Sequence, residues 1–380
     1  MTAKQRAADA FTAAEPALQE LSQWMYDNPE LAFEEHETSA RMVDLLRSAG
    51  YEVEYPAYGL DTAYAARIGS TGPEVIICAE MDALPEVGQA CGHNIIGTAA
   101  LGAGMALAAL ADELGIRVQV LGTPAEEHLG GKVDLINAGA FEGAAASMMI
   151  HPSTKNVVDP AFLAIKHFDV GFHSKTAHAS SNPTLGINAL DAAVQAYVNI
   201  STLRQQLEDS DRVHGIITHG GAAPNIIPDL VSMSWYARSA TDERLDVLME
   251  RMTSCFEAAA LATGCTYELR QSGHGYTAMH NSELMVDLYI ENSKELGRPM
   301  YRRADLPAYT PGSTDMANVS QVVPSIHPML DLYCYPIVNH QAEFAAYTVT
   351  DDGKQAIRDG ALAMAWTIID LAEGDRWGDL

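Results

Sequence analysis

Short apolar runs alternate with helix-like segments between residues 74 and 150, and this alternation restricts the possible folds more than any other feature of the chain. The runs are Glu74–Cys78, Arg117–Leu121 and Ser147–Ile150, and the segments Asn94–Leu114 and Lys132–Ala138 separate them. Strands that alternate with helices form a largely parallel sheet with helices on its faces. Such sheets bind ligands beyond the carboxyl ends of their strands. We therefore expect an α/β domain with functional side chains directly after the apolar runs.

The order of elements changes in the middle of the chain. The expected elements there are a strand at 163–172, a helix at 187–207, strands at 213–218 and 230–236, a helix at 242–262 and a strand at 266–270. This is the βαββαβ order of ferredoxin-like domains, and about 110 residues suffice for an independent core. We predict an inserted domain of residues 162–272 within a main domain of residues 1–161 and 273–380.

Charge and composition exclude several classes of protein. The 380 residues carry a formal charge of -27, and such a surface repels nucleic acids and anionic membranes. The stretch Asn94–Leu114 contains glycines and two acidic residues, so it predicts a buried helix and not a membrane span. Residues 1–15 lack the features of a secretory signal, and the odd number of cysteines argues against a disulfide framework. We expect a cytoplasmic enzyme without a nucleic-acid or membrane partner.

Side chains of the types that bind metals follow the predicted strands. They are Cys91, His93, Glu126, Glu127 and His151, and His340 lies in the C-terminal part of the main domain. Taken singly, each has an ordinary explanation as a partnered polar residue, a small buried thiol or a solvated helix start. Thiolate, imidazole and carboxylate are, however, the ligands of zinc and related ions. Their gathering at the ends of successive strands predicts a metal site.

Two local patterns strengthen the metal hypothesis. Gly92 separates Cys91 from His93, and a glycine permits a tight turn that points both side chains at one centre. Glu126 and Glu127 would ordinarily repel each other. A hydrolase, however, needs one carboxylate on the metal and a second that accepts a proton from the attacking water.

A set of motifs in fixed order resembles a known family. These motifs are AEMDALP at 79–85, ACGHN at 90–94, TPAEE at 123–127, IHP at 150–152, TAHAS at 176–180, GGAAPNIIP at 220–228 and GSTDMANVS at 312–320. Their order resembles the metallopeptidase family of aminoacylases, glutamate carboxypeptidases and auxin-conjugate hydrolases. Within it the chain looks most similar to the branch of p-aminobenzoyl-glutamate hydrolase and the β-alanyl-lysine dipeptidases. The resemblance covers nearly the whole chain.

This resemblance implies roles for ten residues. The implied metal ligands are Cys91, His93, Glu127, His151 and His340, and the implied catalytic and substrate-binding residues are Glu126, Asp82, His178, Asn225 and Arg238. Glu126 would be the general base, Asp82 would orient a ligand, and His178 would stabilise the oxyanion in the partner subunit's site. The other two would bind the substrate and its carboxylate. One or two ions would be bound, zinc or manganese first, with cobalt or nickel as alternatives.

The same resemblance implies that the inserted domain is a lid that also forms a homodimer. The expected reaction is hydrolysis of an amide bond beside a free carboxylate by water that the metal activates. An N-acyl amino acid, an aroyl-glutamate and a dipeptide all remain open as substrates. Two alternatives remain as well: a cysteine hydrolase that uses Cys91 as its nucleophile, and a metal-bound homologue without catalysis.

Two further segments keep two interpretations each. Arg238 on its predicted strand could be a solvated charge, although a bidentate guanidinium suits a substrate carboxylate. The run Gly312–Asp315 could cap a helix or line the substrate pocket.

Overall fold

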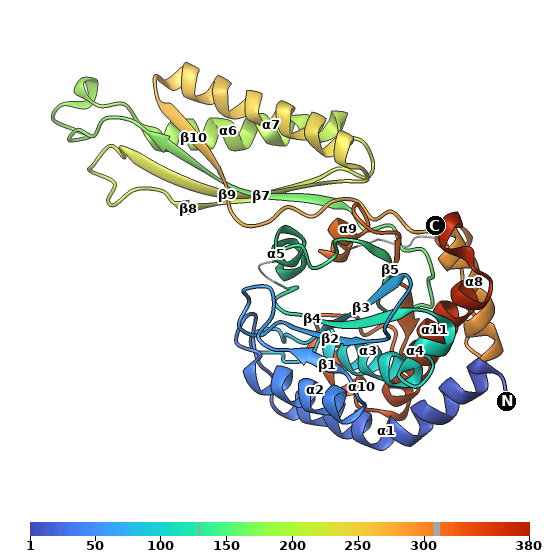
Figure 1. The fold of residues 1–380 in the computed structure, drawn as a ribbon. Coiled ribbons are helices and arrows are strands. Elements are labelled where there is room, and N and C mark those ends of the chain that lie inside the picture. The colour runs from blue at the N-terminus through green and yellow to red at the C-terminus, as the bar shows by residue number, and fades with distance from the viewer. Residues whose placement is uncertain (128–129, 307–311) are drawn as a thin grey trace. The chain divides into compact units, whose positions relative to one another are not determined.

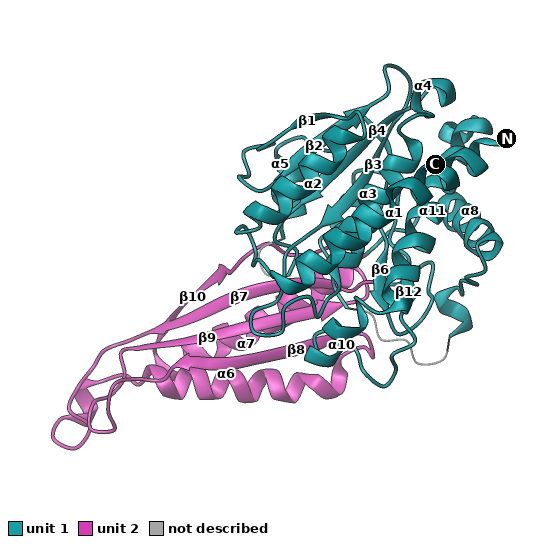
Figure 2. Cartoon of the chain, turned by 90° about the horizontal axis from the view of Figure 1, so that it is seen from below, with its two compact units in different colours: residues 1–161, 279–380 teal, residues 162–278 magenta. Residues whose placement is uncertain are grey.

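The computed structural model describes residues 1–127, 130–306 and 312–380. The chain forms two compact units, one of residues 1–161 and 279–380 and the other of residues 162–278 (Figure 2). Each unit has its own cluster of buried apolar side chains.

The sheet of the first unit has six strands in the order β1-β2-β4-β3-β5-β11. The strands are β1 (Glu52–Glu54), β2 (Tyr64–Ile68), β3 (Glu74–Glu80), β4 (Arg117–Thr123), β5 (Ala144–Met148) and β11 (Ser325–Ile326). The strands β4, β3, β5 and β11 run parallel, and β1 and β2 extend the sheet in antiparallel register. Beyond β5, the short strand β6 (His151–Ser153) pairs in parallel with β12 (Met329–Asp331). The mixed, largely parallel sheet is confirmed.

Helices cover both faces of this sheet (Figure 1). The helices of the unit are α1 (Ala3–Asp27), α2 (His36–Ser48), α3 (His93–Leu107), α4 (Ala111–Leu114), α5 (Gly131–Asn137), α8 (Glu283–Glu295), α9 (Met316–Val319), α10 (Ala342–Tyr347) and α11 (Asp351–Glu373). On one face α3 lies between the sheet and the helices α1 and α11. On the other face α5 and α9 contact each other, and their side chains Leu135 and Val319 share a buried cluster with Ile76 of β3.

One expected helix is divided into two. The single helix predicted over residues 94–114 is α3 followed by a turn and the short helix α4. The turn allows Leu110 and Ala111 to be buried in the same core as α3. The positive φ of Gly115, 63°, then ends α4 before β4 begins.

The second unit has a four-stranded antiparallel sheet in the order β10-β7-β9-β8. Its elements are β7 (Ala164–His173), α6 (Ala189–Leu203), β8 (Arg212–His219), β9 (Leu230–Ser239), α7 (Asp242–Thr263) and β10 (Thr266–Gln271). This βαββαβ order and strand arrangement are ferredoxin-like. Buried and less buried residues alternate along β9, and the buried set packs with α6 and α7. The opposite face of the sheet therefore carries the more accessible side chains.

None of the helices in the described ranges combines the length and the apolar character that a bilayer crossing requires.

Candidate metal centre

A glycine brings the first two candidate ligands to the end of the sheet. Cys91 and His93 flank Gly92, which has a φ of 89° and directly precedes α3. A Cβ atom at Gly92 would lie 2.4 Å from Cγ of Pro152, which is much closer than any side chain tolerates. Only glycine therefore lets this turn approach the residues after β5, and His151 comes within reach of Cys91 for that reason.

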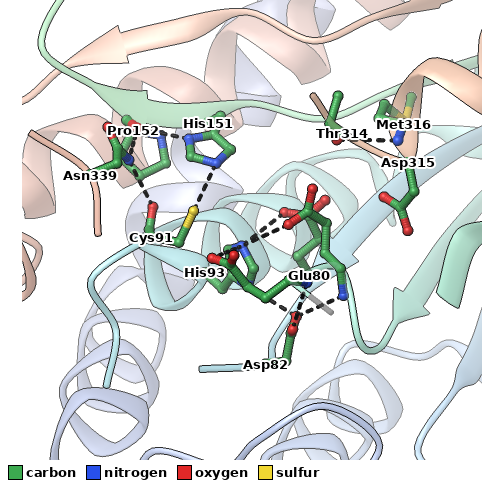
Figure 3. A network of polar contacts seen from close by, with 12 residues as sticks. Glu80, Asp82, Cys91, His93, His151, Pro152, Thr314, Asp315, Met316 and Asn339 are labelled. Atoms are coloured by element: carbon green, nitrogen blue, oxygen red, sulfur yellow. Dashed lines mark hydrogen bonds and ion pairs between the residues drawn. The ribbon is translucent and has the colours of Figure 1, made fainter. Parts of the chain in front are cut away.

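The candidate ligands from distant parts of the chain converge at this point (Figure 3). Cys91 Sγ lies 3.4 Å from His151 Nε2, and His93 Nε2 lies 3.9 Å from Glu127 Oε1. The ligand atoms form overlapping sets in which all atoms lie within 4.8 Å of one another. The sets relevant here are Cys91, His93 and His151; Cys91, Glu127 and His340; and His93, Glu126 and Glu127.

His340 joins the centre through a strained backbone position. Its φ is 70°, and its backbone N–H donates to the carbonyl of Ala90 at 2.9 Å. The preceding Asn339 donates from its side-chain amide to the carbonyls of Cys91 and Pro152 at 3.2 and 3.1 Å. These bonds hold the C-terminal segment against the 90–92 turn, so His340 Nε2 comes within 3.5 Å of Glu127 Oε1.

Asp82 connects three of the converging groups. Its carboxylate accepts the backbone N–H groups of Glu126 and Glu127 at 3.2 and 3.1 Å and lies 3.0 Å from His93 Nδ1. Burial raises the pKa of Asp82, but the nearby His93 and these hydrogen bonds outweigh burial, so its pKa is lowered and the group stays ionised. Because a carboxylate only accepts, His93 carries a proton on Nδ1. Asp82 thus turns the other nitrogen, Nε2, toward the cluster.

A buried carboxyl group supports the turn that presents the adjacent glutamates. Ala125, which precedes them, has a φ of 60° and is buried. Its N–H donates to Glu35 Oε1 at 2.9 Å, and the Thr62 hydroxyl donates to Glu35 Oε2 at 2.8 Å. Burial and the charge of Asp82 raise the pKa of Glu35 to about 7. Glu35 therefore belongs to the framework of the site.

His151 is available as a neutral ligand. Its Nδ1 lies 2.7 Å from the Pro152 carbonyl, which can only accept, so Nδ1 carries the proton and Nε2 faces Cys91. Burial lowers the pKa of His151 to about 4. The Cys91 thiol is different, because burial and the carboxylates of Glu127 and Glu126 raise its pKa well above the usual range.

The charges around Glu126 are unusual for a protein interior. Burial, followed by the carboxylates of Glu80 and Glu127, raises the pKa of Glu126 well above its usual range. A carboxyl group with a raised pKa is suited to accept and return a proton near neutral pH.

Sequence reasoning missed three charged residues beside the cluster: Glu80, Lys132 and Asp315. All three are fully or almost fully buried. Lys132 Nζ lies 2.5 Å from Glu80 Oε1 and 2.6 Å from Asp315 Oδ1. Burial lowers the pKa of Lys132, but Asp315 and Glu80 outweigh it and raise that pKa well above its usual range. The position of Lys132 directly after two glycines that follow the TPAEE motif was the available signal.

This pairing also bears on the capping interpretation of residues 312–315. The Asp315 side chain makes no capping bond to α9, because it binds the ammonium and the backbone N–H of Lys132. The Thr314 hydroxyl instead accepts the Met316 N–H at 3.2 Å.

The remaining three candidate residues lie in the second unit. His178 and Asn225 come from neighbouring loop segments, since the Ala179 N–H donates to the Asn225 carbonyl at 3.0 Å. Arg238 lies on β9, opposite Ile165 of β7 and Arg212 of β8. All three residues are at least partly accessible in this unit.

Comparisons with known proteins agree with these motifs. The model of Peptidase family M20/M25/M40 matches residues 76–350. The Xaa-Arg dipeptidase of Mus musculus is 39% identical to this chain over 386 residues, which cover 97% of this chain and 88% of the relative. One of the p-aminobenzoyl-glutamate hydrolase chains of Escherichia coli strain K12 is 28% identical, with 69% of this chain and 59% of the relative covered.

Solved structures show the same fold. A putative aminohydrolase from methicillin-resistant Staphylococcus aureus has a TM-score of 0.82 at 20% identity and covers 97% of this chain and 99% of its own. A Bacillus subtilis protein, described as a dinuclear metal-binding peptidase of the M20 family, has a TM-score of 0.68 at 22% identity, with 92% and 98% covered. Together with the converging motifs, these similarities confirm the expected relationship. The chain belongs to Peptidase family M20/M25/M40 and is a hydrolase of amide bonds.

Proposed function

We propose that this hydrolase is a metal-dependent dipeptidase that prefers dipeptides with a basic C-terminal residue. The observation that carries the metal dependence is the convergence of a thiol, three imidazoles and carboxylates from positions 91 to 340. The identity of 39% to a protein named Xaa-Arg dipeptidase, over 97% of this chain, supports the substrate class. The formal charge of -27 would also attract a cationic dipeptide.

The residues at the centre fit a divalent ion. Within the described part of the chain, the buried atoms Glu80 Oε2, His93 Nε2 and Glu127 Oε1 have no hydrogen-bond partner. Buried polar atoms without partners destabilise a fold by about 1–3 kcal/mol each, and a cation between them would remove that cost. The proposed ligands are Cys91, His93, Glu127, His151 and His340. Two of the sets share Cys91, which suits two neighbouring ions. Thiolate with imidazole suits zinc, and the carboxylates also suit manganese, with cobalt or nickel as alternatives.

The chemistry divides between the ion and the protein. A bound divalent ion would polarise the scissile carbonyl and lower the pKa of water toward neutrality. Glu126 accepts the proton of the attacking water and returns it to the nitrogen of the leaving amine. Asp82 holds His93 in its ligand orientation and fixes the backbone of Glu126. His178 would donate to the oxyanion, and Asn225 and Arg238 would bind the substrate and its carboxylate.

We propose that the second unit acts as a lid and forms a homodimer through strand β8 and helix α6. Strand β8 is an edge of its sheet, and edge strands offer unpaired backbone groups to a second chain. Exposed apolar side chains lie beside that edge: Val194 and Val198 on α6, and Ile216 and Ile217 on β8. They line a common apolar hollow of about 420 Å³ together with Tyr197 and Gly215.

The dimer proposal has a direct test. Ile216→Asp would place a charge in the proposed interface, so we expect it to halve the mass measured by light scattering at micromolar concentration. Val247→Asp is the matched control, because Val247 is also an exposed β-branched apolar residue of this unit but lies on α7. Equal masses for both variants would contradict the interface.

The free thiols support a proposal for the location of the enzyme. All five cysteines are free, and three of them are buried in the first unit. Free thiols are usual in a reducing compartment, so we propose that the protein acts in the cytoplasm.

The cysteine-hydrolase alternative fits the site less well. A nucleophilic cysteine needs a lowered pKa, whereas burial and two carboxylates raise the pKa of Cys91. The non-catalytic alternative does not explain why the proposed base and the ligand set occur together.

Chelation and a substrate panel test the proposal. Purified protein is assayed by amine release with alanyl-arginine, β-alanyl-lysine, p-aminobenzoyl-glutamate and N-acetyl amino acids, before and after chelation and after addition of zinc or manganese. We expect chelation to remove activity, metal to restore it, and the basic dipeptides to give the highest kcat/KM. Activity that survives complete metal removal would overturn the metal dependence, and a preference for acidic or acyl substrates would overturn the substrate class.

A further inference from the structure

An ammonium group is buried beside the candidate metal centre, although lysine is rarely buried without a partner. Lys132 has 0% of its surface exposed. Its Nζ contacts Glu80 Oε1 and Asp315 Oδ1 at 2.5 and 2.6 Å, and its backbone N–H donates to Asp315 Oδ2 at 2.9 Å. Asp315 thus binds both ends of the residue, which fixes where the ammonium lies.

The backbone is shaped to bring this lysine close to the centre. Gly130 has a φ of 68° and precedes α5. A Cβ at Gly131 would lie 2.0 Å from the carbonyl oxygen of Pro124, so only glycine allows the start of α5 to approach the turn before Glu126. Lys132 follows directly.

Two carboxylates contact the ammonium, and a third lies close to both of them. Oxygen atoms of Glu80, Glu126 and Asp315 lie within 4.8 Å of one another. Carboxylates this close in a protein interior repel strongly unless a cation lies among them. Three convergent carboxylates are also a typical set of ligands for a hard divalent ion. In this chain the cation that contacts two of them is its own lysine.

Glu80 links the lysine to the metal centre, and Figure 3 shows its position beside His93. One oxygen, Oε1, binds Lys132, and the other, Oε2, is buried without a hydrogen-bond partner and lies 3.4 Å from His93 Nε2. The ammonium therefore fixes one side of the carboxylate, and the opposite side faces a proposed metal ligand.

We propose that Lys132 is a positioning residue that serves as a permanent internal cation in the cluster of Glu80, Glu126 and Asp315. It keeps this cluster from binding a divalent ion of its own, and it holds Glu80 against the adjacent metal centre. The second part of this inference rests on the proposed metal centre. The first part requires only the carboxylate cluster.

Removal of the lysine charge should create a new metal site. We compare wild type with Lys132→Met, Lys132→Arg and the double variant Lys132→Met/Asp315→Asn. Each protein is stripped, dialysed against Mn²⁺ and analysed for bound manganese per chain, and its melting temperature is followed as Mn²⁺ is added. We expect Lys132→Met to hold about one more Mn²⁺ per chain than wild type, because three oxygen ligands lose their cation. The other two variants should match wild type, because one keeps the charge and the other removes a carboxylate.

The outcomes separate this inference from the proposed function. A wild type without bound Mn²⁺ would count against the metal centre, while the difference between wild type and Lys132→Met would still test the internal cation. Equal manganese content in folded Lys132→Met and wild type would overturn the inference. If Lys132→Met folds only with added Mn²⁺, or if the double variant folds where the single one fails, charge compensation is supported. If neither Lys132→Met nor the double variant folds at any Mn²⁺ concentration, Lys132 has a packing role. That result would also overturn the inference.

Discussion

The two units place their candidate functional side chains in different ways. In the first unit most of these side chains follow strands of a largely parallel sheet. All of them except the exposed His340 are buried or partly buried, and they come from positions as far apart as 91 and 340. In the second unit His178 and Asn225 lie in loops, and Arg238 lies on an antiparallel strand. Parallel strands end at one edge of a sheet and gather distant residues there, whereas antiparallel strands present residues across a face.

The difference suggests a division of work. A buried cluster with fixed hydrogen bonds can control charge and proton transfer, because a low dielectric strengthens each interaction. Accessible groups on a face or loop are better suited to bind and release a substrate. Variants of the first unit should therefore act mainly on kcat and metal binding, and variants of the second unit mainly on KM.

The largest effect is expected at Glu126. Glu126→Gln removes the proposed acceptor and donor of the proton, so kcat should fall by about 10² to 10⁴, while bound metal and melting temperature stay close to wild type. Steady-state kinetics and metal analysis measure both quantities. Glu52→Gln, on the exposed side of β1, is the control and should retain full activity. Near-normal kcat in Glu126→Gln would exclude it as the base.

The second largest effect is expected at Gly92, where the segments of Cys91 and His151 approach each other. Gly92→Ala would place a Cβ 2.4 Å from Pro152 Cγ, and relief of that contact requires a shift of about 1 Å between the Cys91 and His151 segments. A misplacement of this size can reduce kcat/KM by about 10², and metal affinity should fall with it. Gly143→Ala is the matched control, because Gly143 also has a positive φ of 77°, but a Cβ added there would meet no atom within 4 Å.

Both glycine variants carry the cost of a left-handed alanine, about 1–2 kcal/mol. A loss of activity confined to Gly92→Ala would therefore come from the contact with Pro152. Equal losses in the two variants would mean that the close approach does not matter.

A smaller effect is expected in the second unit. Arg238→Ala should raise KM by about tenfold to a hundredfold, since a charged hydrogen bond contributes about 1.5–3 kcal/mol, with a smaller change in kcat. Arg270→Ala, on the exposed end of β10 in the same unit, should leave KM unchanged. A fall in kcat with constant KM would contradict the division of work between the units.

The sequence predicted which side chains gather at the site better than it predicted how their charges are compensated. Cys91, His93, Glu126, Glu127 and His151 could be found because each follows an apolar run, and the ends of parallel strands meet. His340 was singled out by its residue type without a preceding strand, and the roles of the residues of the second unit came mainly from the family motifs. Lys132 and Asp315 are 183 residues apart, and their pairing depends on how α5 and α9 pack, which no short pattern reveals.

The secondary structure was likewise predicted well where a local pattern marks it. The strands and helices of the ferredoxin-like unit were predicted closely because apolar periodicity marks them. The turn between α3 and α4 was missed, because it lies within residues 105–114, a stretch that contains neither glycine nor proline to mark the end of a helix.

The smallest expected effects are changes of folding stability with pH, and these changes should have opposite signs in the two units. Burial and Asp82 raise the pKa of Glu35 to about 7 in the first unit, and its two hydrogen-bond donors are neutral. In the second unit burial raises the pKa of Asp211, but hydrogen bonds from Arg244 and Ser239 outweigh it, so the net shift is downward. An acid with a raised folded pKa destabilises the protein as pH rises from its unfolded value of 4.5 toward 7. One with a lowered pKa stabilises the protein above its unfolded value of 3.8, and this contribution is lost as pH falls.

Denaturant unfolding between pH 4 and 8 can separate these two contributions. Glu35→Gln keeps an acceptor for the Ala125 N–H, and its amide can donate to the Thr62 hydroxyl. It should therefore remove a loss of stability between pH 5 and 7 of at most about 1.4 kcal/mol per pH unit. Asp211→Asn should instead lower stability at neutral pH and have less effect in acid. Parallel pH profiles for both variants would show that the two buried carboxyl groups do not differ as their surroundings imply, and the electrostatic contrast between the units would then have to be abandoned.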